Sequence, residues 1–92
     1  MAVYRENDGF LVREYELTHS AIVQKQTKKA FLEIVPTKEY GTALFLDGEL
    51  QLTEKDEYIY HESLVHPCLM TAITRKKVCI LGGGDGCAAR EV

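Results

Sequence analysis

The sequence predicts an α+β chain: a small antiparallel β-domain over residues 1–53, then the first helix, strand and glycine loop of an open α/β domain over residues 54–92. Three observations lead to this expectation. Short β-like runs fill the first half, helical spacing begins after Thr53, and an apolar run at Val78–Leu81 enters the glycine-rich segment Gly82–Gly86.

The β-like runs are separated by turn residues, as in a small antiparallel sheet. They are Gly9–Thr18, Ser20–Thr27, Ala30–Val35, Thr42–Leu46 and Glu49–Thr53, with a turn over Pro36–Gly41. Asp47-Gly48 between the last two runs predicts a type I′ hairpin, because both central residues of that turn need positive φ. Leu50 and Leu52 alternate with polar residues, which predicts one buried and one solvent-facing side.

A helix is expected after the last strand. Thr53-Glu54-Lys55-Asp56 is close to a capping box. One apolar stripe follows at helical spacing, formed by Leu64, Val65, Cys68, Leu69, Ala72 and Ile73. Pro67 interrupts the stripe, so we expect a kinked helix or two short ones.

The Val78–Leu81 run is continuously apolar, which is typical of a parallel strand covered on both faces. Such a strand needs a hydrogen-bonded neighbour, and the sequence provides no parallel partner. The chain then stops within a helix that starts at Cys87. We therefore expect a truncated, Rossmann-like α/β domain.

The glycine loop resembles a nucleotide-binding turn, in which glycines let the backbone approach a ligand. Gly82, Gly84 and Gly86 give G-x-G-x-G, and Cys87 falls where the dinucleotide pattern has its last glycine. This spacing favours an S-adenosylmethionine-like nucleoside, with a plain tight turn as the alternative. Asp85 is expected either to cap the helix or to meet an ammonium group of a ligand.

Composition excludes several function classes. The net charge of −3 gives no reason to expect nucleic acid, and Arg75-Lys76-Lys77 is short enough for a solvated strand entry. No apolar run reaches membrane-spanning length, and residues 1–8 lack a signal-peptide core. Three cysteines without a C-x-x-C pair argue against disulfides and zinc and for a reducing cytoplasm. His61 and His66 are five residues apart, which does not suit a shared metal site.

Two stretches resemble one known family. Residues 46–62 resemble the spermidine synthase signature L-D-G-x-x-Q-x-T-E-x-D-E-x-x-Y-[HQ]-E, and residues 81–92 resemble its G-G-G-D-G…R-E-V. The separation of the two stretches also fits, and the resemblance runs from about Thr27 to Val92.

This resemblance implies a polyamine aminopropyltransferase. Such an enzyme moves the aminopropyl group of decarboxylated S-adenosylmethionine, a co-substrate and not a prosthetic group, onto a polyamine amine and releases methylthioadenosine. It also implies a β-domain followed by a methyltransferase-like domain, and an oligomer that is at least a dimer. The family's catalytic Asp lies downstream of this chain, so the 92 residues alone are expected to be inactive.

The resemblance assigns residues to two binding roles. It places His61 in the polyamine pocket with Tyr60 as a wall, Asp85 at the amine end, and the loop glycines against the nucleoside, namely Gly82, Gly83, Gly84 and Gly86. The residues themselves also allow simpler roles: Tyr60 and His61 can only pack and cap, Gln51 supports its loop, and Arg90-Glu91 forms a structural ion pair.

Two positions depart from the family pattern. Lys29 and Ala30 stand where most members have Tyr-Gln in a strand that contacts the nucleoside. Cys87 replaces a small residue, and a thiol at a helix N-terminus is expected to have a lowered pKa and to be sensitive to oxidation. The alternatives left open are a methyltransferase with a β extension and a non-catalytic assembly module.

Overall fold

The computed structural model describes residues 2–19 and 22–92. The chain divides into two compact units, Met1–Lys55 and Asp56–Val92, and each is described by itself. The expected run Ser20–Thr27 begins at Ser20 and Ala21, which lie outside the described residues; the strand found within it is Val23–Gln26.

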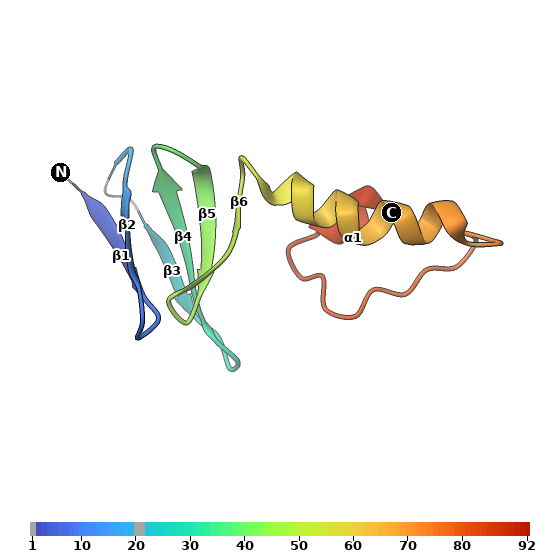
Figure 1. The fold of residues 1–92 in the computed structure, drawn as a ribbon. Helices are drawn as coiled ribbons and strands as arrows, with labels where there is room; N and C mark the ends of the chain where they lie inside the picture. The colour runs from blue at the N-terminus through green and yellow to red at the C-terminus, as the bar shows by residue number, and fades with distance from the viewer. Residues whose placement is uncertain (1, 20–21) are drawn as a thin grey trace. The chain divides into compact units, whose positions relative to one another are not determined.

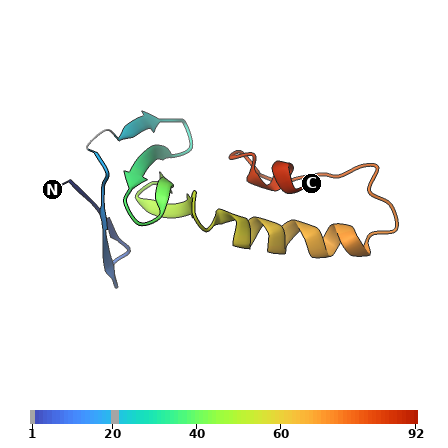
Figure 2. The same ribbon diagram turned by 90° about the horizontal axis from the view of Figure 1, so that it is seen from above.

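The described residues of the first unit form six antiparallel strands in two sheets, whose course can be followed in Figures 1 and 2. A hairpin pairs β1 with β2, and the second sheet has the order β3-β4-β5-β6. The strands are β1 (Val3–Asn7), β2 (Val12–Glu16), β3 (Val23–Gln26), β4 (Phe31–Thr37), β5 (Gly41–Leu46) and β6 (Glu49–Thr53). This confirms the small antiparallel β-domain, with the addition of β1, which the sequence patterns did not reveal.

The boundaries of β4 differ from those expected. Residues 29 and 30 lie in the turn before β4 and not within the strand, and β4 continues through Pro36 to Thr37. Proline is tolerated here because β3 pairs only with residues 31–34, so Pro36 is beyond the end of that neighbour. The Pro36 carbonyl oxygen accepts a hydrogen bond from the Thr18 amide at 3.0 Å.

The β5–β6 hairpin has the predicted turn, with φ of 51° at Asp47 and 79° at Gly48. The predicted alternation in β6 is wrong. Leu44 lies opposite Leu52 and Phe45 opposite Leu50, so Gln51 is the extra residue of a β-bulge. The bulge reverses which face the following residues occupy, and Thr53 is buried opposite Ala43 while Leu50 is partly exposed.

The core of the first unit lies between the β1–β2 hairpin and one face of the larger sheet. Leu17, Val35, Ala43 and Phe45 are buried, and Tyr4 and Tyr15 pack against them. The Tyr4 ring centroid is 4.2 Å from that of Phe45, and the Tyr15 centroid is 5.7 Å from it. The aromatic side chains therefore hold the two sheets together.

Glu6 ties the hairpin to the edge strand β6. Its Oε2 accepts the Leu50 amide hydrogen at 2.7 Å, and its Oε1 accepts the Tyr15 hydroxyl at 3.0 Å. Because Glu6 is buried, Glu6→Ala would leave both donors without this acceptor. We expect a loss of about 2 kcal/mol in the free energy of unfolding, measured by urea denaturation of the full-length protein.

The matched control for this prediction is Glu6→Gln, which keeps an acceptor oxygen and a similar volume. It should lose clearly less stability than Glu6→Ala. Equal losses for the two variants would show that the side-chain volume of Glu6, and not its hydrogen bonds, is what matters.

The second unit contains helix α1 (Glu57–Thr71) and helix α2 (Cys87–Glu91). Helix α1 is continuous through Pro67, so the alternative of two short helices is wrong. The expected capping box is also not used as predicted, because Asp56 is the N-cap residue and Thr53 ends β6. Residues 72 and 73 of the expected stripe lie beyond the last helical residue, Thr71.

The apolar run at 78–81 forms no strand in the described part of the chain, because no neighbouring strand there supplies its hydrogen bonds. It lies instead along a pocket of about 230 Å³, with Leu64, Val65 and Leu69 of α1 and Ala88 of α2 as further walls. Val65 and Ala88 are buried, whereas Leu64 and Leu81 are exposed. Only part of the predicted stripe is therefore covered.

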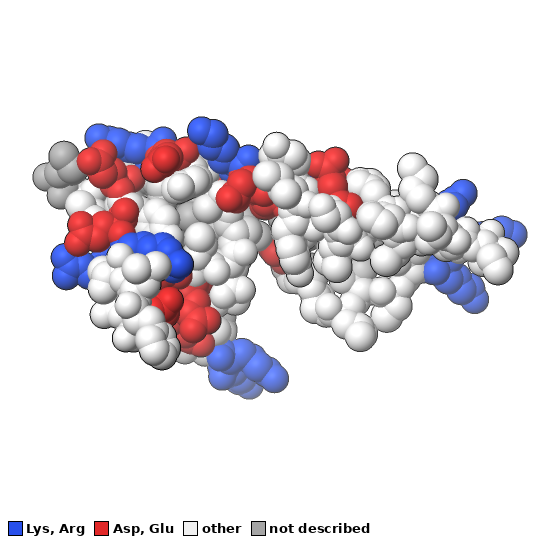
Figure 3. Space-filling model, in the orientation of Figure 1, with Lys and Arg blue, Asp and Glu red and all other residues white. Residues whose placement is uncertain are grey.

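The surface carries charges of both signs. On the face that Figure 3 displays, Lys and Arg side chains lie among Asp and Glu side chains over the first unit, in keeping with the net charge of −3. Among the described residues, no helix has the length and apolar character that crossing a membrane requires.

Candidate functional site

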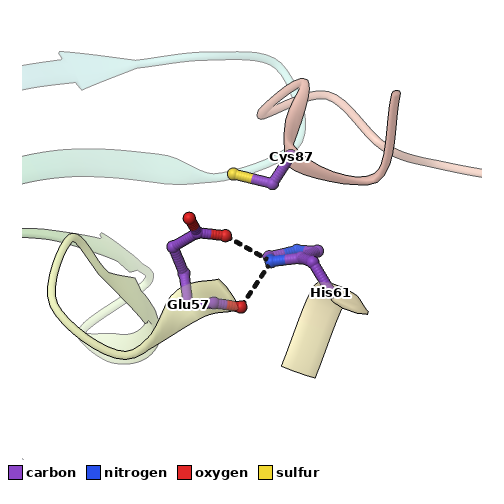
Figure 4. Close-up of side chains that lie close together, drawn as sticks. All are labelled: Glu57, His61 and Cys87. Atoms are coloured by element: carbon purple, nitrogen blue, oxygen red, sulfur yellow. Dashed lines mark hydrogen bonds and ion pairs between the residues drawn. The ribbon is translucent and has the colours of Figure 1, made fainter. Parts of the chain in front are cut away.

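The predicted site residues of the second unit come from the first turns of α1, the glycine loop and α2. Glu57 and His61 are four residues apart on α1 and so share one face of the helix. Nδ1 of His61 lies 2.9 Å from the carbonyl oxygen of Glu57 and 2.8 Å from its Oε2. Figure 4 shows these two contacts with the Cys87 side chain beside them. Because His61 is buried, its ring orientation is set by Glu57.

Arg90 links α2 to α1. Its Nη1 donates to Oε1 of Glu57 at 2.7 Å and its Nη2 donates to Oε2 at 3.0 Å, a two-pronged ion pair. The guanidinium also donates to Oε2 of Glu91 at 2.6 Å. The Arg90 hydrogen bonds lower the pKa of Glu57, and they are also the largest cause of the lowered pKa of Glu91. The expected Arg90–Glu91 ion pair is present, but the pair with Glu57 is what joins the helices.

Cys87 lies between Asp85 and Glu57, and the expected activation of its thiol is wrong. Burial raises the pKa of the Cys87 thiol, and the negative charges of Asp85 and Glu57 raise it further. These effects outweigh the helix N-terminus, because burial and two nearby carboxylates all disfavour a thiolate. The expectation of an oxidation-sensitive thiol loses its physical basis.

Two residues of the glycine loop differ in the space available for a side chain. Gly83 has φ of 69°, and a Cβ placed on it would lie 2.7 Å from Cγ2 of Ile80. The Gly83 carbonyl oxygen also accepts the Gly86 amide at 3.1 Å. By contrast, a Cβ on Gly84 would meet no described atom within 4 Å, and its φ is not in the left-handed range. Side-chain bulk at Gly84 would therefore extend into open space.

Asp85 and Tyr60 are both exposed, and each makes a different contact. Oδ1 of Asp85 accepts the amide hydrogen of Cys87, the first residue of α2, at 2.9 Å, but the N-cap residue of this helix is Gly86 and not Asp85. Asp85 is exposed, so its carboxylate is also accessible to a ligand. The Tyr60 ring stands edge-on to His61 at 5.0 Å between centroids, and Tyr60 is itself exposed.

Two groups of side chains could hold a metal ion by proximity alone. Ligand atoms of Glu57, His61 and Cys87 lie within 4.8 Å of one another, as do those of Glu62, His66 and Glu91. In both groups a carboxylate is already engaged by Arg90, whose charge opposes a second cation. A protonated thiol is also a poor ligand. We therefore assign these groups to the ion-pair network that joins the helices.

Sequence reasoning missed the role of Glu57. The signal was present, because a Glu four residues before a His is a side-chain pair on one helix face. The His66–Glu91 contact, 2.9 Å between Nε2 and Oε1, joins residues 25 apart and has no local sequence signal.

Acid should loosen this network. The pKa values of Glu57 and Glu91 are lowered in the folded protein, so their contribution to stability is present above the ordinary glutamate pKa of about 4.3 and is lost as the pH falls below it. We expect the Tm of the full-length protein to fall on acidification, and less steeply for Arg90→Met. Thermal melts between about pH 7 and about pH 2 measure this, because the loss falls between the ordinary and the lowered pKa values. Parallel curves for the two proteins would contradict it.

A small antiparallel β-domain followed by a helix and a glycine-rich loop is the arrangement expected at the start of an α/β protein with an N-terminal β extension. Comparison with known families agrees for both parts. Residues 57–92 match the model of the spermine/spermidine synthase domain, and residues 22–54 match the model of the spermidine synthase tetramerisation domain. The chain belongs to the polyamine aminopropyltransferase (spermidine synthase) family and corresponds to its N-terminal portion.

Individual relatives support this assignment over nearly the whole chain. A polyamine aminopropyltransferase of a Thermoanaerobacter species is 43% identical over 97% of this chain and 32% of its own length. The spermidine synthase of Thermotoga maritima has a TM-score of 0.89 and 31% identity over 98% of this chain and 32% of that one. A spermidine synthase solved with the transition-state analogue AdoDATO gives the same TM-score and identity. The chain thus spans about a third of the length of these relatives.

Proposed function

We propose that the full-length protein carrying this chain is an aminopropyltransferase of polyamine biosynthesis. It transfers the aminopropyl group of decarboxylated S-adenosylmethionine to a polyamine amine such as putrescine and releases methylthioadenosine. The observation that supports this most is that both halves of the chain match consecutive parts of one enzyme family. The relative solved with AdoDATO, a transition-state analogue, supports an adenosyl co-substrate.

The proposed roles follow the arrangement of the second unit. Gly82, Gly83, Gly84 and Gly86 lie against the nucleoside, with the open space at Gly84 as the place of closest approach. The exposed carboxylate of Asp85 binds the amine end, and His61 with Tyr60 forms part of the polyamine pocket. Such a site would suit a cationic substrate, because a carboxylate and the face of an aromatic ring both attract ammonium groups.

The reaction is the attack of a neutral amine nitrogen on the carbon next to a sulfonium. The new N–C bond takes its electron pair from nitrogen, and the broken C–S bond leaves its pair on the sulfur of methylthioadenosine. The protein must align the two reactants and accept the proton that the amine loses. We propose that the base belongs to another part of the protein, so the 92 residues alone should be inactive.

The two parts of the chain have different proposed tasks. Residues 1–53 form a β-domain that assembles copies of the protein into a homo-oligomer, and residues 54–92 open the nucleoside-binding domain. The name of the matched family model, a tetramerisation domain, supports the first task. We also propose a cytoplasmic location, where three free cysteines remain reduced. Light scattering that gives a monomer mass for the full-length protein would contradict the assembly.

The decisive experiment is an assay of the purified full-length protein. Decarboxylated S-adenosylmethionine and putrescine should yield methylthioadenosine and spermidine in equal amounts. The rival, a methyltransferase, would instead use S-adenosylmethionine and release S-adenosylhomocysteine. A protein that binds neither nucleoside would support the assembly module and overturn the enzyme assignment.

A further inference from the structure

The position of the His61 ring proton follows from its neighbours. Two groups approach Nδ1, the carbonyl oxygen of Glu57 at 2.9 Å and its carboxylate Oε2 at 2.8 Å. A carbonyl oxygen accepts hydrogen bonds only, and so does an ionised carboxylate. Both contacts therefore require the hydrogen to be on Nδ1. In the neutral ring this leaves Nε2 with the lone pair, as an acceptor.

Glu57 is well placed to enforce this arrangement. Its carboxylate is held on both oxygens by Arg90. Its side chain is mostly buried, with 11% exposed, and so is that of His61, with 8% exposed. The Arg90 guanidinium fixes the Glu57 carboxylate and balances its negative charge. The His61 ring therefore faces a hydrogen-bond acceptor that is held in place and whose charge is neutralised. The ring is therefore oriented by a contact that cannot easily rotate away.

We propose that Glu57 is a positioning residue that holds the His61 proton on Nδ1, so that Nε2 accepts a hydrogen bond from a primary ammonium group of the polyamine. This inference rests on the proposed function, which places His61 in the polyamine pocket. It deepens that assignment, because it states which ring atom meets the substrate and what fixes it.

The chemistry of the ligand requires this polarity. An alkylammonium group has three N–H donors and no acceptor. In the opposite tautomer, Nε2 of His61 would carry the hydrogen and face these donors. Two N–H groups would then meet without an acceptor, and neither would form a hydrogen bond after losing its water. With the lone pair on Nε2, the same ring becomes a neutral acceptor. The position of one proton thus decides whether His61 attracts or repels the substrate.

The test uses the full-length protein and the variant Glu57→Gln. In this variant the Arg90 donors hold the amide oxygen, and the NH₂ group faces Nδ1 of His61 and favours a lone pair there. We expect Kd and KM for putrescine to rise at least about tenfold. In ¹⁵N NMR of histidine-labelled protein, the wild type should carry its proton on Nδ1, and the variant should shift toward Nε2.

The matched control is Glu91→Gln, which removes another carboxylate from Arg90 without touching His61. It should share any loss of Tm, yet leave the tautomer and the putrescine Kd within about twofold of the wild type. A wild-type proton on Nε2, or equal putrescine Kd values for the two variants, overturns the proposal. A protein that binds putrescine with the expected tautomer but lacks aminopropyl transfer would overturn the proposed function alone.

Discussion

Asp85→Asn is expected to lower kcat/KM of the full-length enzyme at least about tenfold while its Tm stays unchanged, since one decade corresponds to about 1.4 kcal/mol. The structure explains why stability should survive. The contact of Asp85 with the start of α2 uses a single oxygen, Oδ1, which accepts the Cys87 amide hydrogen at 2.9 Å, and an asparagine oxygen can accept the same bond. The substitution therefore removes the charge and leaves this hydrogen bond.

The expected loss comes from the ligand. A carboxylate contributes about 1.5–3 kcal/mol in a hydrogen bond to a charged donor, more than a neutral amide does. Steady-state kinetics with putrescine and decarboxylated S-adenosylmethionine measure the change. Unchanged kcat/KM would limit Asp85 to its hydrogen bond with the Cys87 amide, whereas a fall in both Tm and kcat/KM would show that the carboxylate charge supports the fold.

Gly84→Ala is expected to raise KM for decarboxylated S-adenosylmethionine at least about tenfold, again with little change in Tm. Its backbone φ is accessible to alanine, and the added Cβ meets no described atom within 4 Å. The fold should therefore accept the methyl group. If the nucleoside lies against this backbone, as we propose, the methyl group occupies the space of the ligand.

Gly83→Ala provides the contrast. Its Cβ would lie 2.7 Å from the Ile80 side chain at a positive φ, so this variant should lose stability as well as activity. Binding of the adenosyl substrate by calorimetry, together with thermal melts, separates the two effects. A Gly84→Ala protein with unaltered KM and Kd would place the nucleoside away from this residue.

Local chemistry made part of the fold predictable. Asp47-Gly48 specified its hairpin because few residue pairs accept two positive φ values. The bulge at Gln51 was not predictable, because an unpaired residue is defined by the partner strand and not by its own sequence. Strand β1 was not predictable for a similar reason. Its polar residues, such as Glu6, are satisfied by partners up to 44 residues away.

The sequence likewise predicted some features of the candidate site and not others. The glycine loop and Asp85 followed from a strong local motif. The state of Cys87 did not, because the largest cause of the raised pKa of its thiol is burial, which depends on the folded structure. The charge of Asp85 is a local cause, but the charge of Glu57 comes from 30 positions earlier in the sequence. The sequence also did not predict that α1 continues through Pro67. Proline removes one backbone hydrogen bond of the helix, but the other interactions of α1 compensate for this loss.

The Arg90–Glu57 ion pair also closes a long loop in the second unit. It joins residues that are 33 positions apart, so the segment between them, which contains the glycine loop, is held at both ends. Closing a segment in this way lowers the number of conformations that it can adopt. The glycine loop therefore has less conformational entropy to lose when a ligand binds to it.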